Sequence, residues 1–314
     1  MKKLALLLAA LSVASVSYAK EVMPEAAPVV EEVVVEQEVV EVKAAPVLRV
    51  TSIGQALEID NTSGAENIGE AVHLANTVGL AIGDNWTFEL MARKTWKAST
   101  DDVNIYDKDG KVTGTWDGVK SNGHRVDLSA TRHFENFAVG LKWRTEQDIE
   151  KFFLPVSYNY GMVSGWATPA FVNYDNKSSD AWYLEAMPVI VKYGPVALGY
   201  YFEGEEETGS GDEHFADHQV RLMLDLYSTD NFRLGAEYWY QFASEHKELN
   251  KDKKYEEYEN NKHVAVLSAA YDLTQNLTVD GYYRYDFNKY DGLVNVTKDD
   301  DYYGEFCVGW TYNF

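Results

Sequence analysis

Charged residues recur inside apolar segments of this chain, and they are the side chains best placed to do chemistry. Glu89 and Arg93 lie in a segment where alternate residues are apolar. Successive side chains of a β-strand point to opposite faces, so such a segment has one apolar and one charged face. Where the apolar face meets lipid, the charged face lines a wet interior and sets its electric field. By this parity the predicted pore-lining residues are Arg93, Arg125, Lys142, Arg144, Arg221, Arg233, Arg284, Glu89, Asp127, Asp225, Glu237, Asp280 and Asp286, joined by Glu305.

The positive and negative members of this set are close to balanced, which predicts weak ion selectivity unless the arginines gather on one wall. Two states of the interior are compatible with these residues. In one, water hydrates the charges and solutes pass. In the other, the charges pair with one another and brace a filled barrel. Charges that are both dry and unpaired are excluded, because their burial costs too much free energy.

Residue groupings typical of catalysis or metal binding do not stand out in the sequence. His214 and His218 have the spacing that chelates a metal on a helix, but on a strand it separates them by about 13 Å. Residues 107–110 begin like a calcium loop and lack its later ligands. No serine, histidine and carboxylate set suggests a hydrolase. We therefore predict no enzyme activity, no cofactor and no metal.

Alternating stretches of about ten residues must position the charges, and they are separated by polar connections. These connections alternate between short ones, such as 83–85 and 194–195, and long ones, such as 99–122 and 244–262. That arrangement is typical of outer-membrane barrels. We predict an all-β fold, a transmembrane antiparallel β-barrel of the outer-membrane type. Its fourteen strands are expected to begin near residues 47, 71, 86, 123, 137, 152, 166, 181, 196, 216, 232, 263, 277 and 302.

Prolines leave the middle of this strand count open. Pro155 and Pro169 fall in the sixth and seventh predicted strands, and a misread pair there would leave twelve. Pro188 lies where the alternation changes phase. Because proline has no N–H to donate to the ladder, we predict a β-bulge at Pro188.

The first 46 residues differ from the rest of the chain. Lys2 and Lys3 precede an apolar stretch that ends in a small-x-small site, which predicts a secretory signal peptide over residues 1–19, cleaved after Ala19. Residues 20–46 are rich in Val, Glu and Pro and cannot build a core, so we predict a low-complexity periplasmic tether. A short element that docks on a partner is the alternative. Residues 47–314 form the predicted barrel, in a bacterial outer membrane.

Composition narrows the class of protein further. The formal net charge of −22 argues against nucleic-acid binding. A single cysteine, Cys307, excludes an intramolecular disulfide framework. Aromatic residues make up 14% of the chain although the mean hydropathy is −0.36. Together with export, these features fit a barrel better than a disulfide-stapled secreted domain.

The end of the sequence carries its most specific pattern. Aromatic and aliphatic residues alternate with polar or small ones up to the last residue, at Phe306, Val308, Trp310, Tyr312 and Phe314. The pattern resembles the closing-strand signal that the bacterial barrel-assembly machinery reads. Outer-membrane lipid and lipopolysaccharide are the other expected partners. The oligomeric state stays open, with a homo-oligomer as one option.

The chain resembles the fusobacterial major outer-membrane porins. The resemblance rests on the signal peptide followed by Lys20-Glu21-Val22-Met23-Pro24, on the Pro/Val/Glu-rich stretch after it, and on the Tyr- and Trp-rich strands. It implies an outer-membrane porin for passive diffusion of small hydrophilic solutes and, in some members, a surface role in adhesion. Adhesion or binding through long surface loops is therefore the alternative function. Smaller oligosaccharide-selective porins are a second, weaker resemblance.

Overall fold

The computed structural model of the chain describes residues 47–62, 71–106, 110–175, 177, 179–209, 213–249, 255–258, 262–287 and 303–314. The predicted signal peptide (1–19) and tether (20–46) lie outside these residues. Every regular element in the described part of the chain is a β-strand. No helix among the described residues is long and apolar enough to cross a membrane.

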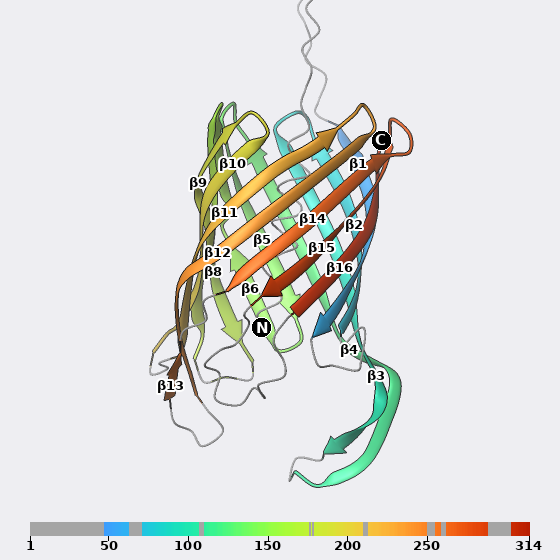
Figure 1. The fold of residues 1–314 in the computed structure, drawn as a ribbon, viewed down its shortest axis with the longest axis vertical. Helices are drawn as coiled ribbons and strands as arrows, with labels where there is room; N and C mark the ends of the chain where they lie inside the picture. The colour runs from blue at the N-terminus through green and yellow to red at the C-terminus, as the bar shows by residue number, and fades with distance from the viewer. Residues whose placement is uncertain are drawn as a thin grey trace, which may run out of the picture. The chain divides into compact units, whose positions relative to one another are not determined.

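Sixteen strand segments follow one another along the chain (Figure 1). They are β1 (Leu48–Thr62), β2 (Ala71–Ile82), β3 (Trp86–Tyr106), β4 (Val112–His133), β5 (Phe137–Glu146), β6 (Ile149–Phe153), β7 (Val156–Tyr160), β8 (Val163–Tyr174), β9 (Ala181–Tyr193), β10 (Val196–Glu207), β11 (His214–Ser228), β12 (Phe232–Leu249), β13 (Tyr255–Tyr258), β14 (His263–Asp272), β15 (Leu277–Phe287) and β16 (Tyr303–Asn313).

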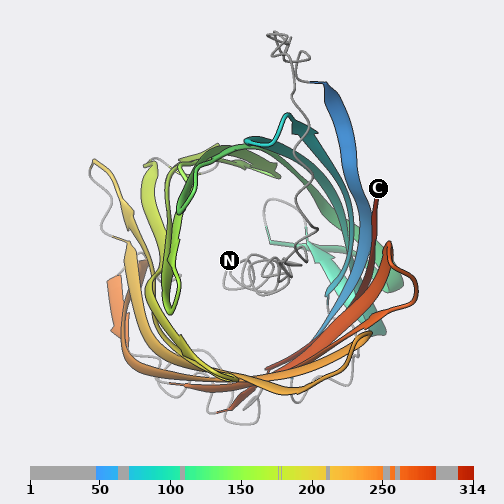
Figure 2. The same ribbon diagram turned by 90° about the horizontal axis from the view of Figure 1, so that it is seen from above.

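The segments close into a ring of fourteen antiparallel strands (Figure 2). β1 pairs with β16, which joins the two ends of the sheet. β6 and β7 both lie between β5 and β8, so they are two halves of one strand interrupted at Leu154 and Pro155. Among the described strands, β13 pairs with the C-terminal end of β12 alone and adds no wall strand. The predicted count of fourteen is confirmed, and the alternative of twelve is wrong.

Apolar side chains alternate with polar ones around this ring, as the sequence predicts. On β5, Leu141 is 67% exposed on the outer face, while Arg144, three residues further along the strand, is buried on the inner one. The residues of the predicted closing-strand signal, on β16 and at the residue after it, are exposed, whereas Glu305 and Cys307 on the other face of β16 are buried. An apolar outer face and a charged inner face make this a barrel of the outer-membrane type.

The predicted bulge at Pro188 is confirmed. Against β10, Tyr200 pairs with Val189 and Phe202 with Ala186, so two residues of β9 face one of β10. On the other side a Cβ at Gly165 would lie 2.3 Å from the Pro188 carbonyl oxygen, so glycine is required where the bulge presses against β8.

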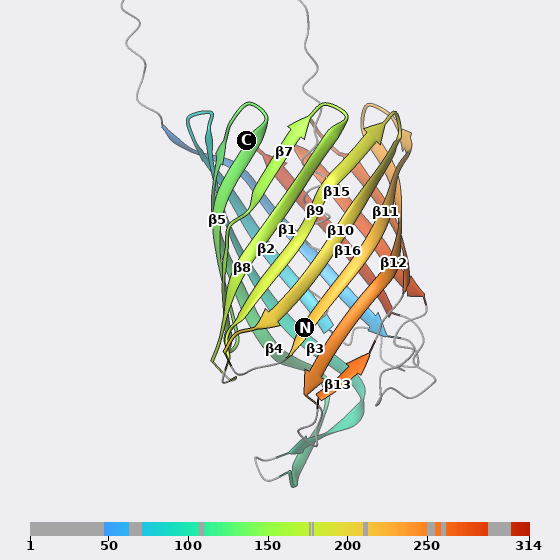
Figure 3. The ribbon, with the colours of Figure 1, turned by 90° about the vertical axis from the view of Figure 1, so that its left-hand side faces the viewer.

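The two rims of the barrel differ. One, the short-turn rim, has a tight connection between every pair of strands that it joins, at 83–85, 134–136, 161–162, 194–195, 229–231 and 273–276. The opposite rim has one tight connection among the described residues, at 147–148. At the opposite rim β3 and β4 continue as a two-stranded arm well beyond their neighbours (Figures 1 and 3). The predicted loop at 99–122 is therefore wrong, because Trp96–Ser121 and Tyr106–Val112 are still paired. Thr and Val in this stretch favour strand over loop.

The inner face also holds one apolar cluster. It comprises Phe153, Ala170, Val172, Tyr174, Ala181 and Tyr183. These residues come from β6, β8 and β9, which are neighbours in the sheet.

Candidate functional site: the charged inner wall

The predicted pore-lining residues all occupy inward-facing positions, and they differ in how deeply they are packed. Seven are buried: Arg125, Asp127, Arg144, Arg221, Arg284, Asp286 and Glu305. Four are half-buried: Glu89, Arg93, Lys142 and Glu237. Three are exposed: Asp225, Arg233 and Asp280. Their role in lining a conduction path stays a prediction.

One carboxylate organises the cations of β4 and β5. Asp127 lies opposite Arg144 in the β4–β5 register, and Arg125 is two residues away on the same face. Arg125 Nε and Nη2 donate to Asp127 Oδ1 and Oδ2 at 2.7 and 2.5 Å, and the same atoms of Arg144 donate at 3.0 and 2.9 Å. Lys142 Nζ lies 2.8 Å from Asp127 Oδ2. We call these residues, with Arg93 of β3, the basic wall.

Two donors of the basic wall are left without a hydrogen-bond partner among the described residues. They are Arg93 Nε and Arg125 Nη1, both buried atoms. Arg93 and Arg125 are directly opposite in the β3–β4 register, so two cationic groups share this part of the wall. A buried donor that makes no hydrogen bond lowers the stability of the folded protein by about 1–3 kcal/mol. The wall therefore favours water or an anionic or polar solute group at this position.

Acidic residues gather on a different part of the ring, at β9 and β10. Glu185 and Glu203 are opposite each other in the register, an arrangement of like charges that is normally unfavourable. Tyr183 donates to Glu203 Oε1 at 3.0 Å and Tyr201 to Glu203 Oε2 at 2.9 Å. The two hydroxyls also lie 3.2 and 3.1 Å from the two Glu185 oxygens. The Arg221 guanidinium stacks 3.4 Å over the Tyr201 ring and supplies a compensating charge.

A third group lies where β15 and β16 meet β1. Arg284 Nε and Nη2 donate to Asp286 at 2.6 and 2.8 Å. Tyr282 donates a short hydrogen bond to Glu305 Oε1, and Arg284 Nη1 lies 3.8 Å from Glu305 Oε2. Arg221 and Arg284 both contact the Trp239 ring, at 3.9 and 5.2 Å from its centroid, so the second and third groups adjoin each other. The sequence left this distribution of arginines open.

Ion pairs at the rims are more exposed. At the short-turn rim Arg233 donates to both Asp272 oxygens at 2.6 and 2.9 Å, and Lys192 contacts Asp225 at 2.8 Å. At the other rim Lys177 lies between β8 and β9, outside the strands. Partial burial lowers the pKa of Lys177, but its hydrogen bonds to Glu213 and Glu207 outweigh that effect and hold the pKa above its ordinary value.

Several inner residues were missed by the sequence reasoning, most clearly Glu58, Asp60 and His73. The same parity rule could have found them, because Glu58 and Asp60 alternate with Leu57 and Ile59 on β1. The alternation of apolar and polar residues is hard to recognise on β1 and β2, because Gln55 and Asn76 place amides on their outer faces.

The histidines considered as metal ligands do not meet. His218 Nδ1 is 2.7 Å from the Tyr200 hydroxyl, whereas His214 Nε2 lies 3.3 Å from Glu245. The predicted separation of the two is thus consistent with their different partners. Of the calcium-like segment, residues 107–109 lie outside the described part of the chain.

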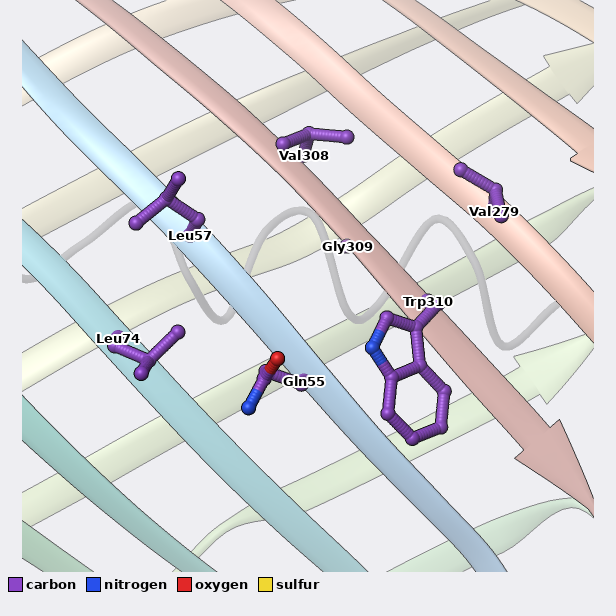
Figure 4. A pocket seen from close by; sticks show the side chains of 7 residues that line it. All are labelled: Gln55, Leu57, Leu74, Val279, Val308, Gly309 and Trp310. Atoms are coloured by element: carbon purple, nitrogen blue, oxygen red, sulfur yellow. The ribbon is translucent and has the colours of Figure 1, made fainter.

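A shallow recess of about 230 Å³ lies on the outer face across β1, β2, β15 and β16 (Figure 4). Its lining is Gln55, Leu57, Leu74, Val279, Val308, Gly309 and Trp310. The Gln55 amide donates to the Asn76 side-chain oxygen at 2.8 Å, which satisfies both polar groups on an apolar face. The recess faces away from the charged interior, so it is not a solute site of the inner wall.

Comparisons with known proteins give structural neighbours only. No protein-family model matches the chain, and no curated protein sequence matches it. Among solved structures, OmpT, an outer membrane protein of Vibrio cholerae, is 15% identical, covering 87% of this chain and all of that one, with a TM-score of 0.44. An anion-selective porin from Comamonas acidovorans is 12% identical over 85% of this chain and all of that one, with a TM-score of 0.43. The Acinetobacter baumannii outer membrane protein Omp33 is 9% identical over 85% of this chain and 99% of that one, with a TM-score of 0.40.

Proposed function

We propose that the chain is a bacterial outer-membrane porin through which small hydrophilic solutes and ions diffuse passively. The observation that carries this proposal is the basic wall, where two buried donors, Arg93 Nε and Arg125 Nη1, have no hydrogen-bond partner among the described residues. Buried donors of this kind favour an interior supplied with water or polar solute groups. An apolar outer face is stable against lipid, because the closed ring pairs its backbone groups within the wall.

The distribution of charge supports passage over catalysis. Cations dominate β3 to β5, whereas carboxylates dominate β9 and β10, so a polar solute in the interior would meet opposite potentials on different walls. Several inner-wall charges of the described strands pair with one another, as Asp127 does with Arg125 and Arg144. The resemblance to fusobacterial porins stays a prediction, because most of it rests on residues 1–46.

Solute uptake tests the proposal directly. Liposomes containing the full-length folded protein are placed in isotonic solutions of neutral sugars of increasing size, and the initial swelling rate is followed by light scattering. We expect swelling faster than in protein-free liposomes, with a rate that falls as the sugar grows. Swelling no faster than in protein-free liposomes, with protein shown to be folded, would contradict passive diffusion.

Adhesion through the surface is a second candidate, and the β3–β4 arm favours it. The arm extends past the other strands and carries exposed apolar residues, among them Val119 at 72%. Lys120 Nζ lies 5.6 Å from the Trp116 ring centroid, so the arm also presents a cation beside an aromatic residue. Removing residues 97–120 is expected to leave sugar-driven swelling unchanged while it abolishes attachment of protein-coated beads to cells. Unchanged attachment would exclude the arm as the adhesive element.

A further inference from the structure

Glu58, Asp60 and His73 bring three buried donor groups together on the inner faces of β1 and β2. We call them the β1–β2 triad. Glu58 is directly opposite His73 in the register, and Asp60 is two residues further along the same face of β1. His73 Nε2 lies 3.7 Å from Glu58 Oε1 and 3.7 Å from Asp60 Oδ2. One oxygen from each carboxylate and one histidine nitrogen all lie within 4.8 Å of one another.

The histidine of the triad points an unsatisfied nitrogen at the two carboxylates. Its side chain is 9% exposed, and Nε2 has no hydrogen-bond partner in the described part of the chain. The other ring nitrogen, Nδ1, is 2.8 Å from the Thr95 hydroxyl on β3. When Thr95 accepts from Nδ1–H, Nε2 is unprotonated and its lone pair faces the carboxylates.

Asp60 is oriented in a similar way from the opposite side. The Tyr303 hydroxyl of β16 is 2.8 Å from Asp60 Oδ1 and 3.0 Å from Glu305 Oε2. This contact orients the carboxylate through Oδ1, and Oδ2 lies on the side of His73 Nε2, at 3.7 Å. Metal-binding histidines and carboxylates commonly have such outer partners, which fix the ring orientation and the tautomer.

We propose that the β1–β2 triad binds a divalent first-row transition metal ion. Imidazole nitrogen and carboxylate oxygen are both zinc ligands, with bonds of about 2.0–2.2 Å. At about 2.1 Å from each donor, tetrahedral coordination separates neighbouring ligand atoms by about 3.4 Å, so the two 3.7 Å pairs of His73 need to close by only a few tenths of an ångström. The two carboxylate oxygens, which lie within 4.8 Å of each other, complete the set by rotation of their side chains. A neutral imidazole and two carboxylates also match the charge of a divalent ion.

The donor set distinguishes among ions. Calcium and magnesium prefer sites made of oxygen alone, whereas imidazole suits zinc, iron, nickel and copper. Three protein ligands leave further coordination positions for water or a solute from the interior. The competing arrangement is a protonated His73 between two carboxylates. At 3.7 Å both carboxylates are within ion-pair distance of a protonated ring, but neither accepts a hydrogen bond from Nε2–H. The zinc titration below separates the two arrangements.

Zinc titration of the full-length protein, folded in detergent and washed with chelator, tests the proposal. Calorimetry is expected to give one tight site per chain. His73→Gln and Asp60→Asn should each weaken zinc binding by 30-fold or more, and Thr95→Val by about tenfold through the outer shell. Cobalt gives a second readout, because its visible d–d band should be present in the wild type and lost in His73→Gln.

His246→Gln is the matched control. His246 is also buried beside a carboxylate, but its Nε2 already contacts Asp217 Oδ1 at 2.8 Å. We expect zinc affinity within twofold of the wild type for this variant. Folding of each variant is checked by its heat-dependent shift in gel mobility, and Thr95→Val serves if a ligand variant does not fold. Equal affinity in the wild type, His73→Gln and Thr95→Val, or the absence of a tight site in the wild type, would overturn the proposal. Neither outcome depends on whether the interior conducts.

Discussion

Replacing Asp127 by Asn tests how the basic wall is held together. The substitution keeps the side-chain volume but removes the negative charge that Arg125, Arg144 and Lys142 share. Arg125 and Arg144 are only 2% and 1% exposed, so bulk solvent cannot replace the lost carboxylate around them. The three cations would then repel one another across a small region of the wall.

The burial of these cations sets the expected loss in the free energy of unfolding. Breaking a buried ion pair by removing one partner costs about 3–5 kcal/mol. Water in the interior would hydrate part of the released charge, so we expect about 3 kcal/mol for Asp127→Asn, the lower end of that range. Asp225→Asn is the matched control, because Asp225 has a single lysine partner at 2.8 Å and its side chain is 61% exposed. An exposed pair of this kind contributes about 0–1 kcal/mol.

Urea titration of the barrel folded into lipid vesicles, followed by tryptophan fluorescence, gives the free energy of unfolding. Coincident unfolding and refolding curves are needed for the comparison. We predict that Asp127→Asn loses at least about 2 kcal/mol more than Asp225→Asn. Equal losses for the two variants, or a loss under about 1 kcal/mol for Asp127→Asn, would refute the reasoning that one carboxylate neutralises the wall.

Three further perturbations are predicted. Gly165→Ala should lower the free energy of unfolding by about 1–3 kcal/mol, because the added Cβ would clash with the Pro188 carbonyl oxygen. A Cβ at Gly114 would meet nothing closer than 3.9 Å, so Gly114→Ala should change that free energy little in the same urea titration. Equal effects of the two substitutions would contradict a clash at Gly165. Deleting Phe314 should reduce the amount of heat-modifiable barrel in the outer membrane, since the exposed aromatic row of β16 would be shortened; undiminished assembly would argue against the closing-strand signal. In an NMR titration Lys177 should lose its proton above pH 10.5, because its pKa is raised. Its ion pairs therefore contribute stability below that pH, and the contribution disappears as the pH rises through the raised pKa. Titration of Lys177 at or below pH 10.5 would exclude this contribution.

Period-2 alternation was enough to predict the barrel, because each wall strand must turn one face to lipid. The strand starts at Ala71, Trp86, Phe137 and Phe232 were predicted correctly, since turn residues precede them. The arm was missed because its residues do not separate into an apolar and a polar face. Outside the lipid a strand has no reason to alternate, so parity cannot distinguish the arm from a loop.

Inward-facing positions could be predicted, but their partners could not. Parity places Arg125 and Asp127 on one face of β4, whereas the contact with Arg144 depends on the β4–β5 register, which the short turn fixes. The same applies to the β1–β2 triad, where the register places His73 opposite Glu58. Sequence alone therefore predicts which charges face inward and leaves open which of them meet.

Single-channel recording of the full-length protein in a planar bilayer tests the central claim most directly. We predict discrete, stable conductance steps. We also predict a small reversal potential under a salt gradient, because the cationic and acidic walls of the interior offset each other. No steps from protein shown to be folded by circular dichroism would contradict a conducting interior, and the inner charges would then be braces of a closed barrel.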